Sequence, residues 1–205
     1  MHSDIVYSGA SFNSIASLNN SENHIAIIGS PAKTFGMQSI SNGYLYIPNQ
    51  NTYKQIKNTI GSLYLDHGSI HSANATIAAY TKGEEWLDDF LIYLEKTMHW
   101  IQDFVTNELP EVKLYKPEGT YQVWLDFSKL NLSDTALKHL VVNQAKLALT
   151  PGDCFEGSHT QFMRMNVASP LSKIQQAFRQ LKNAINEGVD CSFNEAVSDT
   201  DCCSC

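Results

Sequence analysis

The stretch Gly29-Ser30-Pro31-Ala32-Lys33-Thr34-Phe35-Gly36 decides the fold class, because it places one lysine where the strand-forming residues 24–28 meet a turn. Burial destabilises an ammonium ion, so a lysine held at the end of a buried strand can present a neutral amine that attacks carbonyl groups. The alternative is a solvated lysine, since most lysines near strand ends face water. Lys33 is therefore the first candidate for a catalytic residue.

Hydrophobic periodicity around this stretch predicts alternating strands and helices. We expect strands at residues 5–7, 25–28, 43–47, 112–115, 121–127, 145–149 and 161–167. We expect helices at residues 52–65, 70–80, 84–108, 133–142 and 169–186, with Ser133 and Ser169 as N-caps and Pro110 ending the longest one. Strands interleaved with helices predict an α/β or α+β arrangement of layers.

Composition excludes several classes of function. The 205 residues are 43% hydrophobic, which is enough for a real core, and the formal net charge of -7 argues against nonspecific nucleic-acid binding. No apolar run approaches the ~20 residues that span a bilayer, so no membrane partner is expected. The N-terminus is polar and shows no signal peptide, which predicts a cytoplasmic protein.

Two further kinds of side chain bear on chemistry. Arg164 lies in a predicted strand between Met163 and Met165, where its guanidinium could hold a carboxylate with two parallel hydrogen bonds. Judged without other information, it is more simply an arginine of an edge strand. The seven histidines show no ligand spacing, so no metal site is predicted.

The residues Ser30-Pro31-Ala32-Lys33-Thr34-Phe35 resemble the Ser-Pro-Ser-Lys-Thr-Phe signature around the Schiff-base lysine of fold-type I pyridoxal phosphate (PLP) enzymes. More specifically, the chain is similar to MalY/PatB-type carbon-sulfur lyases, the cystathionine beta-lyase-like branch of the class I/II aminotransferases. The likeness covers roughly residues 2–187. It continues through Gly83-Glu84-Glu85-Trp86-Leu87-Asp88, Pro117-Glu118-Gly119-Thr120-Tyr121, Trp124-Leu125-Asp126-Phe127, Pro151-Gly152 and Phe162-Met163-Arg164-Met165-Asn166.

This resemblance implies an α/β fold made of two parts, and a tail outside the resemblance would follow them. Residues 1–80 would be a remnant of the large PLP-binding domain, with residues 5–7 inside a parallel sheet. Residues 81–187 would form the long helix and the small C-terminal α+β domain. Residues 188–205 would be a flexible cysteine-rich tail.

The resemblance also implies roles for four residues. Lys33 would form the Schiff base with PLP and shuttle the proton of the substrate α-carbon. Ser30 would contact the cofactor phosphate, and His2 would lie beside the cofactor ring. Arg164 would hold the substrate α-carboxylate.

Departures from the family pattern qualify the expected activity. The aspartate that pairs with the pyridine nitrogen and the glycine-rich phosphate loop would precede Met1, and Ala32 replaces the usual second serine. We therefore expect an incomplete or split carbon-sulfur β-lyase that acts on cystathionine or a related small sulfur amino acid. Its partner would be a second copy, forming a homodimer, or a complementary N-terminal segment. A class I/II aminotransferase is an alternative.

The C-terminal tail supports a different class of function. Cys154 is the one cysteine in the body of the chain, whereas the last fifteen residues contain Cys191, Cys202, Cys203 and Cys205 together with several serines and acidic residues. Such a segment cannot build a core by itself. The alternative is a non-catalytic remnant that serves as scaffold, or as leader and carrier for a modified cysteine-rich peptide.

Overall fold

A computed structural model describes residues 2–18, 25–40, 43–155, 157 and 159–189. The chain divides into two compact units. The first unit consists of Met1–Ile92 and Glu118–Thr120, and the second of Tyr93–Pro117 and Tyr121–Cys205. The cysteines of the tail fall outside the described residues, so the carrier hypothesis is not addressed by the structure. The proposed domain boundary between residues 80 and 81 stays a prediction.

The described residues of the first unit form two short strands, three helical segments and the start of a long helix. In chain order these are η1 (Ile15–Ser17), β1 (Ile27–Gly29), β2 (Tyr44–Tyr46), α1 (Gln50–Ser62), α2 (Ile70–Lys82) and the first part of α3 (Glu84–Glu108). The predicted helices at residues 52–65 and 70–80 are confirmed as α1 and α2. Asn49 caps α1, because its side-chain oxygen accepts a hydrogen bond from the amide of Thr52 at 2.9 Å.

The strands of the first unit pair differently from the prediction. β1 and β2 are antiparallel, with Gly29 opposite Tyr44. A Cβ at Gly29 would lie 2.1 Å from Cζ of Tyr44, so glycine is required under that ring. The predicted strand at residues 5–7 is wrong, since Val6 forms only an isolated antiparallel bridge with Gly119. The described part of this unit therefore holds a two-stranded antiparallel ribbon and no parallel sheet.

Residues 5–7 are held by backbone hydrogen bonds to a distant segment of the chain. The amide of Tyr7 donates to the carbonyl of Glu118 at 3.0 Å, and the amide of Thr120 donates to the carbonyl of Ile5 at 2.9 Å. A Cβ at Gly119 would lie 2.6 Å from the carbonyl oxygen of Ile5, so the two backbones approach closely. Residues 118–120 thus complete the first unit.

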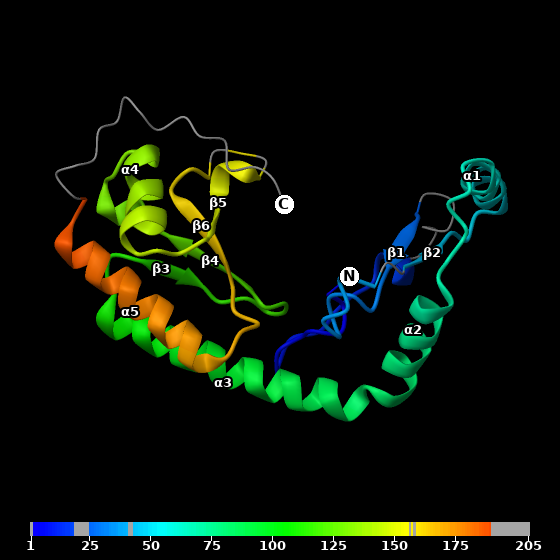
Figure 1. Cartoon of the computed structure of the whole chain (residues 1–205), viewed down its shortest axis with the longest axis horizontal. Helices are drawn as coiled ribbons and strands as arrows, with labels where there is room; N and C mark the ends of the chain where they lie inside the picture. Colours follow the sequence, from blue (N-terminus) through cyan, green and yellow to red (C-terminus); the bar gives the residue numbers. More distant parts are fainter. Residues whose placement is uncertain (1, 19–24, 41–42, 156, 158, 190–205) are drawn as a thin grey trace. The chain divides into compact units, whose positions relative to one another are not determined.

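The second unit combines the rest of α3 with a four-stranded sheet and further helices. These are β3 (Lys113–Tyr115), β4 (Gln122–Asp126), η2 (Ser128–Leu130), α4 (Asp134–Lys138), the π-helix η3 (His139–Gln144), β5 (Thr150–Pro151), η4 (Gly152–Cys154), β6 (Phe162–Asn166) and α5 (Leu171–Glu187). The sheet is antiparallel throughout, in the order β3-β4-β6-β5. Within this unit, α3 and α5 run side by side along the sheet (Figure 1).

One face of this sheet is the core. Along β4 and β6, buried and half-buried residues alternate, and the buried ones are Val123, Leu125, Met163 and Met165. Phe178 of α5 packs edge-on between Trp100 and Phe104 of α3, with both ring centroids at 6.0 Å. An ion pair between Lys182 and Glu108 joins the two helices near their C-terminal ends.

Most predictions for this region are confirmed, and two are wrong. The helix at residues 84–108 is confirmed, and it ends at Glu108, two residues before Pro110. Ser133 caps α4 by accepting from the amide of Ala136 at 3.2 Å. Ser169 does not cap α5, because the N-cap is Pro170 and makes no side-chain hydrogen bond. No strand forms at residues 145–149, since the chain pairs with β6 only at Thr150–Pro151.

Among the described residues, no helix has the length and apolar character needed to cross a bilayer.

Candidate active site

Lys33 lies in a turn directly after β1, and hydrogen bonds fix the backbone on both sides of it. The amide of Phe35 donates to the carbonyl of Pro31 at 2.9 Å, and the amide of Met37 donates to the carbonyl of Ala32 at 2.8 Å. Ser30 is buried, and its hydroxyl accepts the amide of Ala32 at 3.1 Å. The lysine side chain is half-buried. Ser30 and Lys33 are therefore brought together in one rigid turn.

A buried hydroxyl joins this turn to the N-terminal segment. Thr34, which is 0% exposed, donates from Oγ1 to Oδ2 of Asp4 at 2.6 Å. A hydrogen bond to a charged acceptor inside a protein is stronger than one between neutral groups. His2, the third predicted site residue of this unit, lies half-buried two residues before Asp4, and its carbonyl accepts the amide of Ile5 at 3.0 Å. The contact between Asp4 and Thr34 was not predicted.

Phe35 holds the other side of the turn against the junction of α2 and α3. Its ring lies 5.7 Å from Tyr80 in an edge-on arrangement and 5.9 Å from Trp86. A Cβ at Gly83 would lie 2.6 Å from Cε1 of Phe35, so glycine leaves the space that the ring needs. Burial, and then the charges of Tyr44 and Asp4, raise the pKa of the Tyr80 phenol. Tyr80 therefore stays neutral at physiological pH.

Arg164 lies at the centre of β6 in the second unit. Its Nη2 donates to Oγ1 of Thr150 at 3.3 Å, and its Cζ lies 4.8 Å from the ring centroid of Phe155. Its Nε is buried and has no hydrogen-bond partner among the described residues. A buried N–H without an acceptor costs about 1–3 kcal/mol, which is the cost that a bound anion would remove. Thr150 and Phe155 were missed, because β5 is only two residues long and Phe155 lies in the irregular segment after η4, so neither has a local signal.

The predicted residues thus fall into two groups. Ser30, Lys33 and His2 belong to the first unit, and Arg164 belongs to the second.

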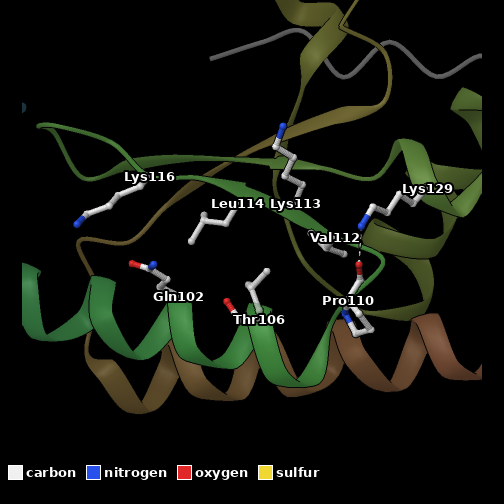
Figure 2. A pocket seen from close by; sticks show the side chains of 9 residues that line it. Gln102, Thr106, Pro110, Val112, Lys113, Leu114, Lys116 and Lys129 are labelled. Atoms are coloured by element: carbon white, nitrogen blue, oxygen red, sulfur yellow. Dashed lines mark hydrogen bonds between the residues drawn. The ribbon is translucent and has the colours of Figure 1, made fainter.

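A separate groove of about 380 Å³ lies between α3 and β3 and contains none of the predicted site residues. Figure 2 shows Gln102 and Thr106 rising from α3 toward Leu114 and Lys116, while Lys113 points away from the helix. No group of three or more His, Cys, Asp or Glu side chains in the described part of the chain could hold a metal ion.

Comparison with known families decides the relationship. The family described as aminotransferase class I and II matches residues 1–181. The chain belongs to this family. The relationship inferred from the residues around Lys33 is therefore confirmed, and so is the α/β fold class.

Three individual proteins show which relatives this chain is similar to. The cystathionine beta-lyase PatB of Bacillus subtilis strain 168 is 32% identical over 187 residues, which cover 91% of this chain and 48% of PatB. The protein MalY of Escherichia coli K12 is 32% identical over 161 residues, covering 78% of this chain and 41% of MalY. A PLP-bound protein from Clostridium difficile 630 has a similar structure, with a TM-score of 0.88, 34% identity and coverage of 90% of this chain and 48% of its own. The chain spans about half the length of the relatives it matches.

Proposed function

We propose that this chain is part of a PLP-dependent carbon-sulfur β-lyase that acts on cystathionine or a related sulfur amino acid. The observation that carries the proposal is Lys33, a half-buried residue on a turn whose backbone is fixed by hydrogen bonds and by the packing of Phe35. The name of PatB, a cystathionine beta-lyase with 32% identity, supports the substrate class. A fixed turn holds the backbone of Lys33 in place, so the cofactor bound to this lysine would keep one position.

The residues present fit PLP at the lysine end of the cofactor. The Lys33 amine would hold the aldehyde, and the Ser30 hydroxyl lies three residues away in the same turn, where it would reach the phosphate. His2 would lie beside the ring. When bound, PLP supplies an electron sink that stabilises negative charge at the substrate α-carbon.

The chain's own residues would then divide the work of the elimination. Lys33 Nζ would take the proton from the substrate α-carbon, and the bond between the β-carbon and sulfur would then break, with its electron pair leaving on the sulfur. The guanidinium of Arg164 holds the substrate α-carboxylate with paired N–H donors. Uptake of the proton by the leaving sulfur and hydrolysis of the remaining fragment give a thiol, pyruvate and ammonia.

A covering partner is part of the proposal. Large apolar side chains are exposed along β1, β2, α1 and α2, among them Ile28, Tyr46, Tyr53 and Ile77. Since the chain also spans about half of its relatives, we propose that a complementary segment or a second copy covers this face. Light scattering after size exclusion measures this directly. A monomer that binds no added segment would contradict it.

A cytoplasmic location is also part of the proposal, and cell fractionation tests it.

The decisive experiment is to add PLP to the purified chain, trap the adduct with borohydride and identify the modified lysine by peptide mass. We expect a new absorbance band and a cofactor mass on Lys33, both lost in Lys33→Ala. Lys57→Ala, which removes a lysine from α1 of the same unit, is the matched control and should keep both. Modification spread over many lysines, or none at saturating PLP, would refute the proposal.

Product analysis separates the lyase from the aminotransferase. Elimination releases a free thiol and pyruvate from cystathionine, whereas amino-group transfer needs an added keto acid and releases no thiol. The assay requires the chain together with whatever segment covers its first unit. Keto-acid dependence without thiol release would favour the aminotransferase.

A further inference from the structure

The second unit places a single row of side chains across its whole sheet. Tyr115 of β3 is paired with Trp124 of β4, Trp124 with Arg164 of β6, and Arg164 with Thr150 of β5. Directly paired residues of antiparallel strands project from the same face. The opposite face carries the buried core residues. The row therefore lies on the face that the core does not use.

One aromatic ring lies against the guanidinium, and further rings extend from it along the row. Phe155 lies against both Arg164, at 4.8 Å from Cζ, and Trp124, at 5.0 Å between ring centroids. Phe162 lies 6.2 Å from Trp124 and 6.0 Å from Tyr115, so the rings form a continuous strip. Tyr115, at the end remote from Arg164, is 44% exposed. The strip thus runs from Arg164 to the partly exposed ring of Tyr115, whose centroid lies 4.3 Å from Lys113 Nζ.

Two cations lie at the row, Lys113 over the ring of Tyr115 and, within the row itself, Arg164. Its Nη2 is bound to Thr150, and its buried Nε has no acceptor within the described structure. Lys113, at the other end, donates to the hydroxyl of Tyr115 at 2.9 Å, and this hydrogen bond raises the pKa of Lys113. A ligand that supplies one carboxylate at Arg164 would satisfy the open donor. The remainder of such a ligand would meet rings.

We propose that Trp124, Phe162 and Tyr115 form a subsite for the side chain of the amino acid whose carboxylate binds Arg164. The proposal rests on the proposed function, in which Arg164 holds the substrate α-carboxylate, and it adds the kind of side chain that the substrate carries. Neighbouring strands are about 4.8 Å apart, so Trp124 lies about one strand spacing from Arg164 and Tyr115 about two. A thioether that carries an apolar or aryl group spans this distance, and sulfur and rings both bind favourably against aromatic side chains. A short polar side chain reaches none of the rings.

The test measures binding of simple carboxylates to the full chain without cofactor. The probe is 3-(phenylthio)propionate, which joins a carboxylate to an aryl thioether, and propionate is the comparison. Proton–nitrogen NMR follows the indole N–H signals of the tryptophans, identified with Trp86→Phe and Trp124→Phe. We expect the aryl thioether to bind about 10-fold more tightly than propionate and to shift the Trp124 signal, with Trp86 unmoved.

Substitutions then assign the preference to the row. Trp124→Leu should reduce the preference for the aryl thioether to about 2-fold and leave the affinity for propionate unchanged. Tyr115→Ala, at the exposed end, should reduce the preference about 3-fold with little risk to folding, which circular dichroism checks. Trp86→Leu in the first unit is the matched control and should leave the affinities for both carboxylates unchanged. Arg164→Met should abolish binding of both carboxylates.

Equal affinity for the two carboxylates, or a preference that survives both row substitutions, would overturn the subsite. These outcomes do not depend on PLP. If Lys33 takes no cofactor but the aryl thioether binds as expected, the lyase proposal fails and the subsite stands. If Lys33 takes PLP and the thioether shows no preference, the subsite alone fails.

Discussion

The two units bury their apolar side chains to very different extents. The largest fully buried residues lie in the second unit with the single exception of Ile5, and they include Phe127, Phe178 and Leu181. In the first unit, α1 has no buried residue and α2 buries only Ser72. The second unit therefore has the core that stabilises a domain, whereas the first depends on a few specific contacts around Lys33.

Removing a core ring should have the largest effect. Phe178 is 1% exposed and contacts Trp100 and Phe104. Phe178→Ala should lower the free energy of unfolding by about 3–5 kcal/mol, measured by urea titration with tryptophan fluorescence. Tyr53→Ala in α1, where the ring is 41% exposed, should cost less than about 0.5 kcal/mol. Equal losses at both positions would remove the contrast between the units.

A smaller but still large loss is expected at Gly152. A Cβ there would lie 1.9 Å from the carbonyl oxygen of His159, so the chain before β6 must move. Gly152→Ala should destabilise the second unit by about 2–3 kcal/mol, measured as a lower melting temperature. Gly61→Ala, in α1, has open space around the new Cβ and is the control. That substitution should be neutral or slightly stabilising, because alanine favours helix.

In the first unit, we expect a local effect at the lysine turn. Thr34→Val keeps the shape of the side chain and removes the hydrogen bond to Oδ2 of Asp4, which keeps the weaker one from Ser3. The turn should lose about 1–2 kcal/mol of local stability, seen as faster amide exchange at residues 35 and 37, while the melting temperature of the second unit stays constant. Thr59→Val, an exposed threonine of α1, is the control. A global loss of stability in Thr34→Val would show that the units are not independent.

The smallest effect concerns a surface ion pair of the second unit. Lys138 Nζ lies 2.6 Å from Oδ2 of Asp153, and this hydrogen bond raises the pKa of Lys138 above its ordinary value of 10.5. Because the folded pKa is the higher one, the stabilisation is complete below pH 10.5 and is lost as pH rises through the folded value. Lys138→Met should cost about 0.5 kcal/mol at pH 8. High salt should reduce this difference, and a salt-independent loss would contradict the assignment.

The same contrast explains what could be predicted from the sequence. Helix α3 was predictable to the residue, because its apolar period and Pro110 are local signals. Lys33 and Arg164 were found through short motifs. The contact of Asp4 with Thr34 was not predicted, because it joins residues 30 positions apart, and Phe155 was missed because it lies in an irregular segment without a local signal. The predicted strand at residues 145–149 was wrong, because the amides of Ala145 and Leu147 donate to carbonyls of the π-helix η3 instead of to a neighbouring strand. A short apolar run does not distinguish these two structures.

The pairing of residues 5–7 with Glu118–Thr120 also limits how this protein can be divided. The first unit receives three of its residues from a segment that lies after α3, so the chain passes between the units at three points. A recombination or a protease cut between residues 92 and 118 would leave Ile5 and Tyr7 in one fragment and their backbone partners in the other. Neither unit is therefore a contiguous module. Recombination at a point between residues 7 and 118 would separate these backbone partners.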